Sequence, residues 1–202
     1  MATLSTTTAY SAYTLTDLVE AWAYNFGTAA HGAGNTGGFN TGYLAGTQYA
    51  SSSATSYGFI AESDTGLSYN ILSHVVTGNL DSLAFGEDLN GTNLNTSSGN
   101  YTLTDVTFSI TDLGWDSSTT NAALADLLTL DADNGDVLSQ LSDLLAGLED
   151  SFASAIASYN STYGASETFE TITVAELAQV GAAELATVGV AAFSESDLAL
   201  AA

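Results

Sequence analysis

Residues 66–86 read Gly66-Leu-Ser-Tyr-Asn-Ile-Leu-Ser-His-Val-Val-Thr-Gly-Asn-Leu-Asp-Ser-Leu-Ala-Phe-Gly86. The second half, from Gly78 to Gly86, alternates apolar and polar residues as a half-buried strand does. Tyr69 lies near the end of the preceding apolar run, five residues before His74, one of the two histidines. Residues five apart on a strand point to opposite faces. If Tyr69 and His74 act together, the chain must therefore turn between them, and the site lies on a loop.

The rest of the chain predicts strands first and helices later. A capping-box pattern at Thr14 and Asp17 precedes the first helical periodicity. Polar turns between short strands indicate an antiparallel sheet. The order of the elements predicts an α+β fold with helices on one face of that sheet. We expect strands at 39–50, 57–62, 67–72, 80–85 and 101–110, helices at 15–26, 122–130 and 174–185, and one apolar stripe over 137–156.

Composition excludes several classes of function. The sequence has 23 Asp and Glu residues but no Lys and no Arg. It therefore has no basic patch that could neutralise the phosphates of a nucleic acid, and binding to anionic membranes is disfavoured. The absence of Cys excludes disulfides, thiolate metal sites and cysteine nucleophiles. The 202 residues are enough for one domain with a substantial core. No uninterrupted run reaches the ~18 apolar residues of a membrane span.

Four stretches, in this order along the chain, resemble the HasA-type haemophores, a family of secreted bacterial haem-acquisition proteins. The first is Tyr13-Thr-Leu-Thr-Asp-Leu-Val-Glu-Ala-Trp-Ala-Tyr-Asn-Phe-Gly27, and the second is Thr36-Gly-Gly-Phe-Asn-Thr-Gly-Tyr-Leu-Ala-Gly-Thr-Gln-Tyr-Ala50. The third is residues 66–86, and the fourth is Tyr101-Thr-Leu-Thr-Asp-Val-Thr-Phe108. A histidine lies between the first two. The resemblance implies a curved antiparallel sheet with helices on one face and haem held between two loops. It also implies a carrier of haem b (ferric protoporphyrin IX), not an enzyme.

The same resemblance implies that Tyr69 is an axial ligand of the haem iron and that His74 is its partner. Taken alone, a tyrosine is most often a packing residue and a histidine most often a hydrogen-bonded structural one. A phenolate is a hard anionic donor that suits ferric iron. A neutral imidazole accepts the hydrogen bond of the phenol and favours the anionic form. The segment between Tyr69 and His74 is shorter here than in the familiar members of the family.

His31 is the candidate for the second axial ligand that the resemblance implies, and an exposed loop histidine is the alternative. It lies in a glycine-rich segment, 28–38, which predicts a loop. With no Lys or Arg, the haem propionates must face solvent or meet backbone N–H groups and hydroxyls. The rest of the pocket is expected to be apolar. Its expected wall residues are Phe39, Tyr43, Tyr49, Leu72 and Val75.

The resemblance also implies an export route and partners. Residues 1–186 form the expected haem-binding domain, and residues 187–202 the expected C-terminal signal for a type I ABC exporter. The N-terminus lacks the positive and apolar regions of a secretory signal peptide. We expect a secreted, extracellular monomer that takes haem from host or environmental haemoproteins. It would pass the haem to an outer-membrane TonB-dependent receptor.

Two other classes stay open at this point. A secreted acidic adhesin or surface protein without a cofactor has a similar composition. A hydrolase based on paired carboxylates is the alternative from the enzymes, although no nucleophile elbow, Walker loop or HExxH motif occurs in the sequence.

Overall fold

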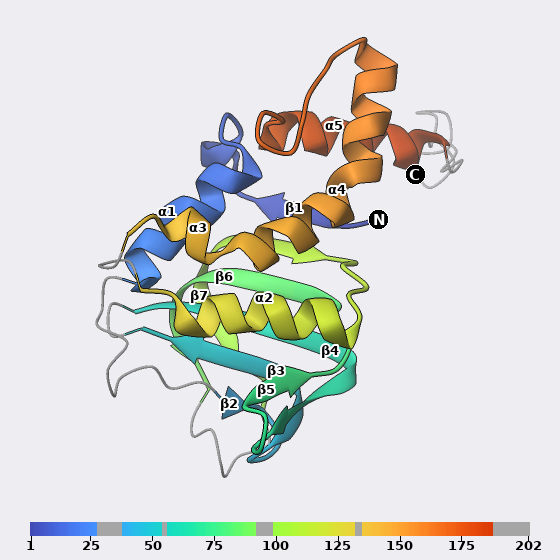
Figure 1. Ribbon diagram of the computed structural model, residues 1–202. Coiled ribbons are helices and arrows are strands. Elements are labelled where there is room, and N and C mark those ends of the chain that lie inside the picture. Colours follow the sequence, from blue (N-terminus) through green and yellow to red (C-terminus); the bar gives the residue numbers. More distant parts are fainter. Residues whose placement is uncertain (28–37, 54–55, 92–98, 132–134, 188–202) are drawn as a thin grey trace, which may run out of the picture.

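One antiparallel sheet of seven strands forms the body of the molecule, in the order β1-β7-β6-β4-β3-β2, with β5 paired to β4 (Figure 1). The computed structural model describes residues 1–27, 38–53, 56–91, 99–131 and 135–187. The strands are β1 Thr3–Thr6, β2 Gly38–Phe39, β3 Ala45–Ser52, β4 Tyr57–Asn70, β5 Val75–Thr77, β6 Ser82–Asn90 and β7 Thr102–Thr111.

Five α-helices and one 3-10 helix accompany the sheet in the described ranges. They are η1 Thr8–Tyr10, α1 Leu15–Gly27, α2 Ser117–Thr129, α3 Val137–Gln140, α4 Ser142–Tyr163 and α5 Val174–Thr187. None of the helices in these ranges has the length and apolar character needed to cross a membrane.

The capping box predicted at the start of α1 is present. The Thr14 N–H donates to Asp17 Oδ2 at 2.9 Å, and the Asp17 N–H donates to Thr14 Oγ1 at 3.0 Å. Two backbone donors that have no partner inside the helix are thereby satisfied. The box starts the helix where its apolar stripe begins, so that Leu15, Trp22 and Phe26 are all buried.

A cluster of aromatic rings joins α1 to the sheet. Trp22 stacks on Phe26 with ring centroids 4.6 Å apart and meets the edge of Phe85 at 4.8 Å. Phe85 stacks in turn on Phe108 of the neighbouring strand, also at 4.6 Å. Trp22 Nε1 donates to the carbonyl of Gly58 at 3.2 Å, so its one polar atom is satisfied. These contacts fix the middle of β4 and β6 against the helix.

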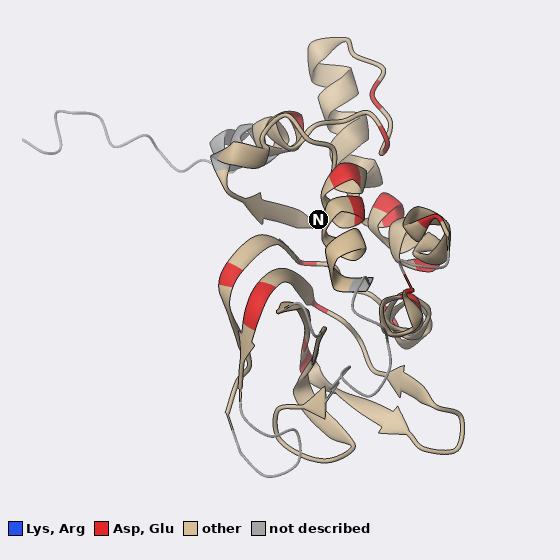
Figure 2. Ribbon diagram, turned by 90° about the vertical axis from the view of Figure 1, so that its left-hand side faces the viewer, with Lys and Arg blue, Asp and Glu red and all other residues tan. Residues whose placement is uncertain are grey.

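The helices cover one face of the sheet, as predicted for the α+β fold. Phe59 and Phe85 share one core with the helices, whereas Ile60 and Leu103 belong to a separate small cluster on the opposite face. Successive strand residues point to opposite faces, which explains why neighbours such as Phe59 and Ile60 separate. Figure 2 shows the strands bending as they cross the molecule, which agrees with the expected curved sheet.

Several predicted boundaries were wrong. The strands expected at 57–62 and 67–72 are a single long strand, β4, and residues 71 and 72 lie in the turn beyond it. Residues 40–44, expected in a strand, connect β2 to β3. The stripe over 137–156 is divided between α3 and α4 at Leu141, whose φ and ψ of −105° and 24° break the helix. Helix α2 begins at Ser117, earlier than expected, because Asp116 caps it.

The long strand β4 positions the candidate site. Its first half, Tyr57 to Glu62, pairs with β3 on one side and β6 on the other and is held by the core. Its second half, Ser68 to Asn70, pairs with β5 in a short hairpin. The core therefore holds one end of β4 while the other end carries the hairpin to the surface.

Candidate functional site

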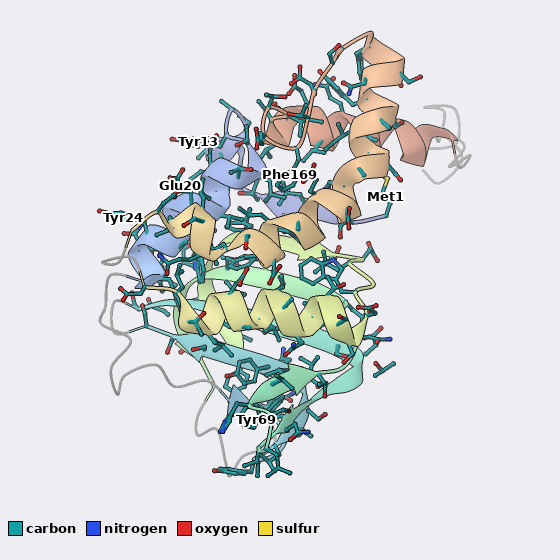
Figure 3. All side chains as sticks on the ribbon, in the orientation of Figure 1. Met1, Tyr13, Glu20, Tyr24, Tyr69 and Phe169 are labelled. Carbon is teal, nitrogen blue, oxygen red and sulfur yellow. The ribbon has the colours of Figure 1, made fainter. Side chains whose placement is uncertain are left out.

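Tyr69 is the penultimate residue of β4. Its backbone N–H donates to the carbonyl of Leu44 at 2.7 Å, and it is paired across the hairpin with Val76, which is buried. The Tyr69 side chain is half-buried and packs against the main core. Figure 3 shows Tyr69 near the end of the molecule that is remote from Phe169 and Met1. The ring is thus fixed by the sheet while one edge stays accessible.

His74 is the last residue of the turn that joins β4 to β5. Residues 71–74 are all exposed. His74 has a φ of 57°, in the left-handed region that few residues other than glycine adopt, although His is among those enriched there. The turn predicted between Tyr69 and His74 is therefore present. It reverses the chain within four residues.

The structure brings the two predicted side chains together. Tyr69 Oη lies 2.8 Å from His74 Nδ1, which is a hydrogen bond, and the ring centroids are 6.2 Å apart at an interplanar angle of 63°. The shorter segment between the two residues thus still permits direct contact. When Nδ1 accepts the hydrogen bond of the phenol, the other imidazole nitrogen, Nε2, carries the hydrogen of the neutral ring.

Three exposed apolar side chains lie in the turn between this pair and on the neighbouring connection. Leu72 is 94% exposed and Ile71 is 53% exposed, both in the turn, and Tyr43 is 70% exposed on the connection that precedes β3. Tyr43 is next to Leu44, whose carbonyl accepts from Tyr69, so the two segments lie side by side. Large apolar side chains this exposed need an explanation when they gather at one place, and a ligand with an apolar surface supplies one.

Two of the expected wall residues are not at the surface. Phe39 and Tyr49 are 3% and 8% exposed, and their rings meet in the core with centroids 5.0 Å apart. They form the layer beneath the site instead of its wall. Val75, at the start of β5, is half-buried. Of the five expected wall residues, Tyr43 and Leu72 are the ones that are strongly exposed beside Tyr69.

Burial affects the pKa of Tyr49, the tyrosine beneath the site. It raises the pKa of Tyr49 to about 12, and the neighbouring Tyr69 and Tyr101 add to that effect. Tyr49 is therefore held as a neutral phenol at physiological pH, a poor ligand for a metal ion. Tyr69 differs from Tyr49 in being only half-buried and in having an imidazole hydrogen-bonded to its oxygen.

The site lies in the part of the chain that carries no carboxylate. All 23 Asp and Glu residues fall outside residues 21–61 and 65–80. In Figure 2 the hairpin end of the described chain, at the bottom, accordingly shows no acidic residue. An anionic group such as a propionate meets no fixed negative charge from these two segments. This pattern is visible in the sequence as a gap between acidic residues and not as a motif.

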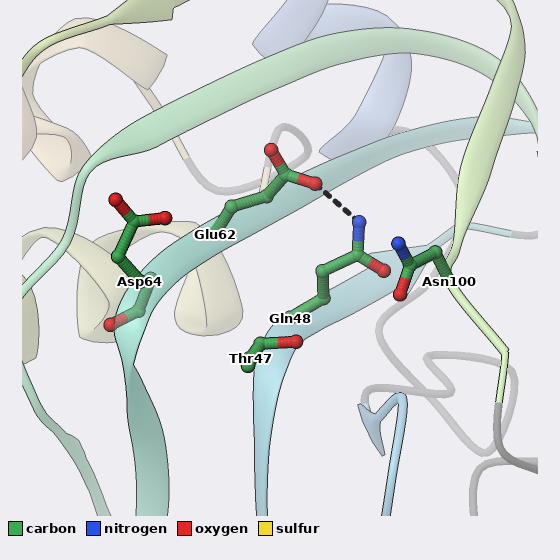
Figure 4. Close-up of a pocket in the computed structure, with 6 residues that line it drawn as sticks. Thr47, Gln48, Glu62, Asp64 and Asn100 are labelled. Atoms are coloured by element: carbon green, nitrogen blue, oxygen red, sulfur yellow. Dashed lines mark hydrogen bonds between the residues drawn. The ribbon is translucent and has the colours of Figure 1, made fainter.

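A cavity of about 300 Å³ lies apart from the tyrosine–histidine pair and is lined by polar groups (Figure 4). Gln48 is buried in its wall, where it hydrogen-bonds Glu62 and accepts from the Tyr101 N–H at 2.6 Å. Glu62 also accepts from Ser82 at 3.0 Å. These bonds tie β3 to β4, β6 and the start of β7. A cavity lined by two carboxylates and polar groups does not suit a planar apolar ligand with acidic substituents. The lining residues are Thr47, Gln48, Glu62, Ser63, Asp64 and Asn100.

His31 lies outside the described residues, and so does most of the tail, 188–202. Strand β2 follows the segment with His31 in the sequence, and there the Tyr101 hydroxyl donates to the Phe39 carbonyl at 3.3 Å. Asn40 Oδ1 accepts from the Gln48 N–H at 3.0 Å beside it. Residues 39 and 40 are therefore well anchored.

These features define an α+β protein whose candidate site combines a tyrosine–histidine pair with exposed apolar side chains. Comparison with known proteins identifies the family. The model of the heme-binding protein A (HasA) family matches residues 1–202, and the chain belongs to that family. The family is described as heme-binding, and nothing in the comparisons supports a hydrolase or an adhesin.

Individual relatives agree with this assignment. The hemophore HasA of Serratia marcescens is 38% identical over 90 residues, which cover 41% of this chain and 48% of that protein. The chain thus spans about half the length of this curated relative. The holo hemophore HasA from Yersinia pestis has a TM-score of 0.57 at 24% identity and covers 73% of this chain and 89% of its own. A HasA variant from Yersinia pseudotuberculosis has a TM-score of 0.58 at 22% identity with the same coverage.

Proposed function

We propose that this protein is an extracellular haemophore that captures ferric haem b and delivers it to an outer-membrane receptor for iron acquisition. The observation that carries the proposal is the 2.8 Å hydrogen bond between Tyr69 Oη and His74 Nδ1, on an exposed turn flanked by Ile71 and Leu72. Family membership supports haem as the ligand.

Tyr69 is the proposed axial ligand and binds the iron through its phenolate oxygen. As the iron–oxygen bond forms, the phenol loses its proton, and His74 Nδ1 is the base in hydrogen-bond contact that accepts it. The resulting imidazolium N–H then donates to the phenolate oxygen, so the contact is kept while its direction reverses. A hard anionic oxygen favours ferric over ferrous iron and disfavours oxygen chemistry, which suits a carrier.

His31 is the proposed second axial ligand. Closing a glycine-rich segment onto a ligand costs conformational entropy, roughly 1–2 kcal/mol per residue that becomes ordered. The net contribution of His31 to affinity is therefore smaller than that of Tyr69. The exposed side chains of Tyr43, Ile71 and Leu72 are the proposed apolar contacts of the porphyrin face.

The charge pattern supports the orientation of the ligand. Haem carries two propionates, and residues 21–61 and 65–80 contain neither a carboxylate to repel them nor a Lys or Arg to bind them. The propionates therefore point to solvent or to hydroxyl and backbone N–H groups. The proposed partners are haemoproteins as donors, a TonB-dependent receptor as acceptor, and a type I ABC exporter that reads residues 187–202. The protein acts as a monomer.

Titration with haemin tests the proposal. We expect saturation at one haem per chain with a shifted Soret band. The His31→Ala variant is expected to keep most of the affinity while its spectrum changes to that of a different sixth ligand. Absence of a saturable shift in the unmodified protein contradicts the haem-carrier proposal. Loss of binding on His31→Ala with full binding by Tyr69→Phe reverses the assignment of the two ligands.

A further inference from the structure

One residue holds the turn that brings the tyrosine and the histidine together. The ladder between β4 and β5 ends at the pair Asn70 and Val75, so residues 71–74 have no ladder partners. The side-chain oxygen of Asn70, Oδ1, accepts from the Leu72 N–H at 2.9 Å and from the Ser73 N–H at 3.3 Å. Its backbone carbonyl accepts from the His74 N–H at 2.8 Å.

Three consecutive backbone donors therefore converge on the two oxygens of Asn70. An asparagine whose side chain mimics a backbone carbonyl is a known way to start a tight turn. The last of the three donors belongs to His74, and that residue has the left-handed φ of 57° that closes the turn. Without these bonds, the backbone of an exposed four-residue turn has many alternative conformations, and few of them direct His74 back toward Tyr69.

We infer that Asn70 is the positioning residue of the haem site. By fixing the turn, Asn70 holds His74 Nδ1 at hydrogen-bond distance from the Tyr69 oxygen. This inference deepens the proposed function and rests on it for its effect on haem. Asn70 itself touches neither the Tyr69 hydroxyl nor the His74 ring in any hydrogen bond of the described structure. Its role is to fix the turn in the protein before haem arrives.

The geometry also explains how a short segment keeps the pair. Tyr69 is fixed by the sheet through Leu44 and Val76, so only the histidine side of the contact depends on the turn. The last residue of this turn, His74, has a positive φ that few residues other than glycine adopt, so the turn needs bonds that hold it in place. Asn70 supplies the bonds that stabilise this conformation.

The experiment compares three variants of the full chain. Asn70→Ala removes the side-chain acceptor, and Asn70→Asp keeps an acceptor of the same shape. Asn79→Ala is the matched control, because Asn79 is an exposed asparagine on the other side of β5. The first readout uses the apo protein, in which the ¹⁵N shifts of the imidazole report whether His74 Nδ1 accepts a hydrogen bond. The second readout is the affinity for haemin.

We expect Asn70→Ala to lose the Nδ1 acceptor signature and to weaken haemin binding by up to about tenfold, the effect of losing the hydrogen bond between Tyr69 and His74. Asn70→Asp should retain the signature, and Asn79→Ala should match the unmodified protein. In a His74→Gly background, which removes the imidazole without strain at φ 57°, Asn70→Ala should cause no further loss of affinity.

An unchanged signature and unchanged affinity in Asn70→Ala overturn the inference. So does an equal loss of the signature in Asn79→Ala. If the unmodified protein fails to bind haemin while Asn70→Ala still loses the signature, the proposed function fails and the positioning role of Asn70 stands. Backbone amide spectra of each variant show whether the sheet is intact, and if Asn70→Ala alters it, Asn70→Leu, which is similar in size to Asn and has no acceptor, takes its place in the same comparison.

Discussion

Replacement of His74 by glycine removes the imidazole without disturbing the turn. His74 has a φ of 57°, a value at which glycine is unstrained, whereas alanine is not. His74→Gly therefore isolates the hydrogen bond between Tyr69 Oη and His74 Nδ1, and His74→Ala adds the cost of the left-handed backbone. The difference between the two variants measures that backbone cost, about 1 kcal/mol.

The expected size of the effect follows from the geometry. A hydrogen bond of 2.8 Å to a group that becomes charged contributes about 1.5–3 kcal/mol. Because His74 is exposed and Tyr69 is half-buried, water competes with the contact, and the lower end of that range applies. About 1.5 kcal/mol corresponds to a roughly tenfold higher dissociation constant for haem. Without the imidazole, solvent must accept the phenol proton.

Competition for haemin against a haem-binding protein of known affinity measures this effect. The same substitution in a Tyr69→Phe background provides the control, since phenylalanine has no oxygen for His74 to act on. There His74→Gly should change the affinity by much less than tenfold. Equal affinity of His74→Gly and the unmodified protein would refute the reasoning and make His74 a bystander. An equal loss in both backgrounds would show that His74 acts independently of Tyr69.

Three further outcomes are expected. Burial raises the pKa of Tyr49 from 10.0 to about 12, so its stabilising effect is complete below pH 10 and is lost as the pH rises toward 12. Denaturant unfolding should show a loss of up to about 3 kcal/mol over this window, and Tyr49→Phe should make the profile flatter. The rate of haemin association should rise with salt concentration, because salt screens the net charge of −23. Ser68→Glu places a new charge next to Tyr69 and should slow association more than Ser154→Glu, which adds the same charge at an exposed position on α4. Deletion of residues 193–202 should leave haem binding intact and retain the protein inside the cell; normal export of the shortened chain argues against a C-terminal signal.

The sequence predicted the elements that depend on local periodicity. Helix α1 follows from its capping box and apolar stripe, and the turn between Tyr69 and His74 follows from the two-residue period of strands. Haem as the ligand came from resemblance to the family and not from periodicity. The break at Leu141 was missed because the apolar stripe continues through it, and no glycine marks it.

The wall of the site was only partly predictable. Phe39 and Tyr49 are apolar enough for a ligand pocket, yet the sheet directs both toward the helices. Sequence alone does not decide which face of a strand is covered when both faces carry apolar residues, as Phe59 and Ile60 do here. The role of Asn70 was also not foreseen, although an asparagine before a short turn is a recognisable signal.

Haemin spectra of Tyr69→Phe and Tyr43→Phe test the central claim most directly. Both variants lose one hydroxyl from a tyrosine at the same end of the molecule, and Tyr43 is the more exposed of the two at 70%. If Tyr69 is the iron ligand, Tyr69→Phe loses the phenolate-to-iron charge-transfer band and most of the affinity, while Tyr43→Phe keeps both. An unchanged charge-transfer band and affinity in Tyr69→Phe would contradict the assignment of the site.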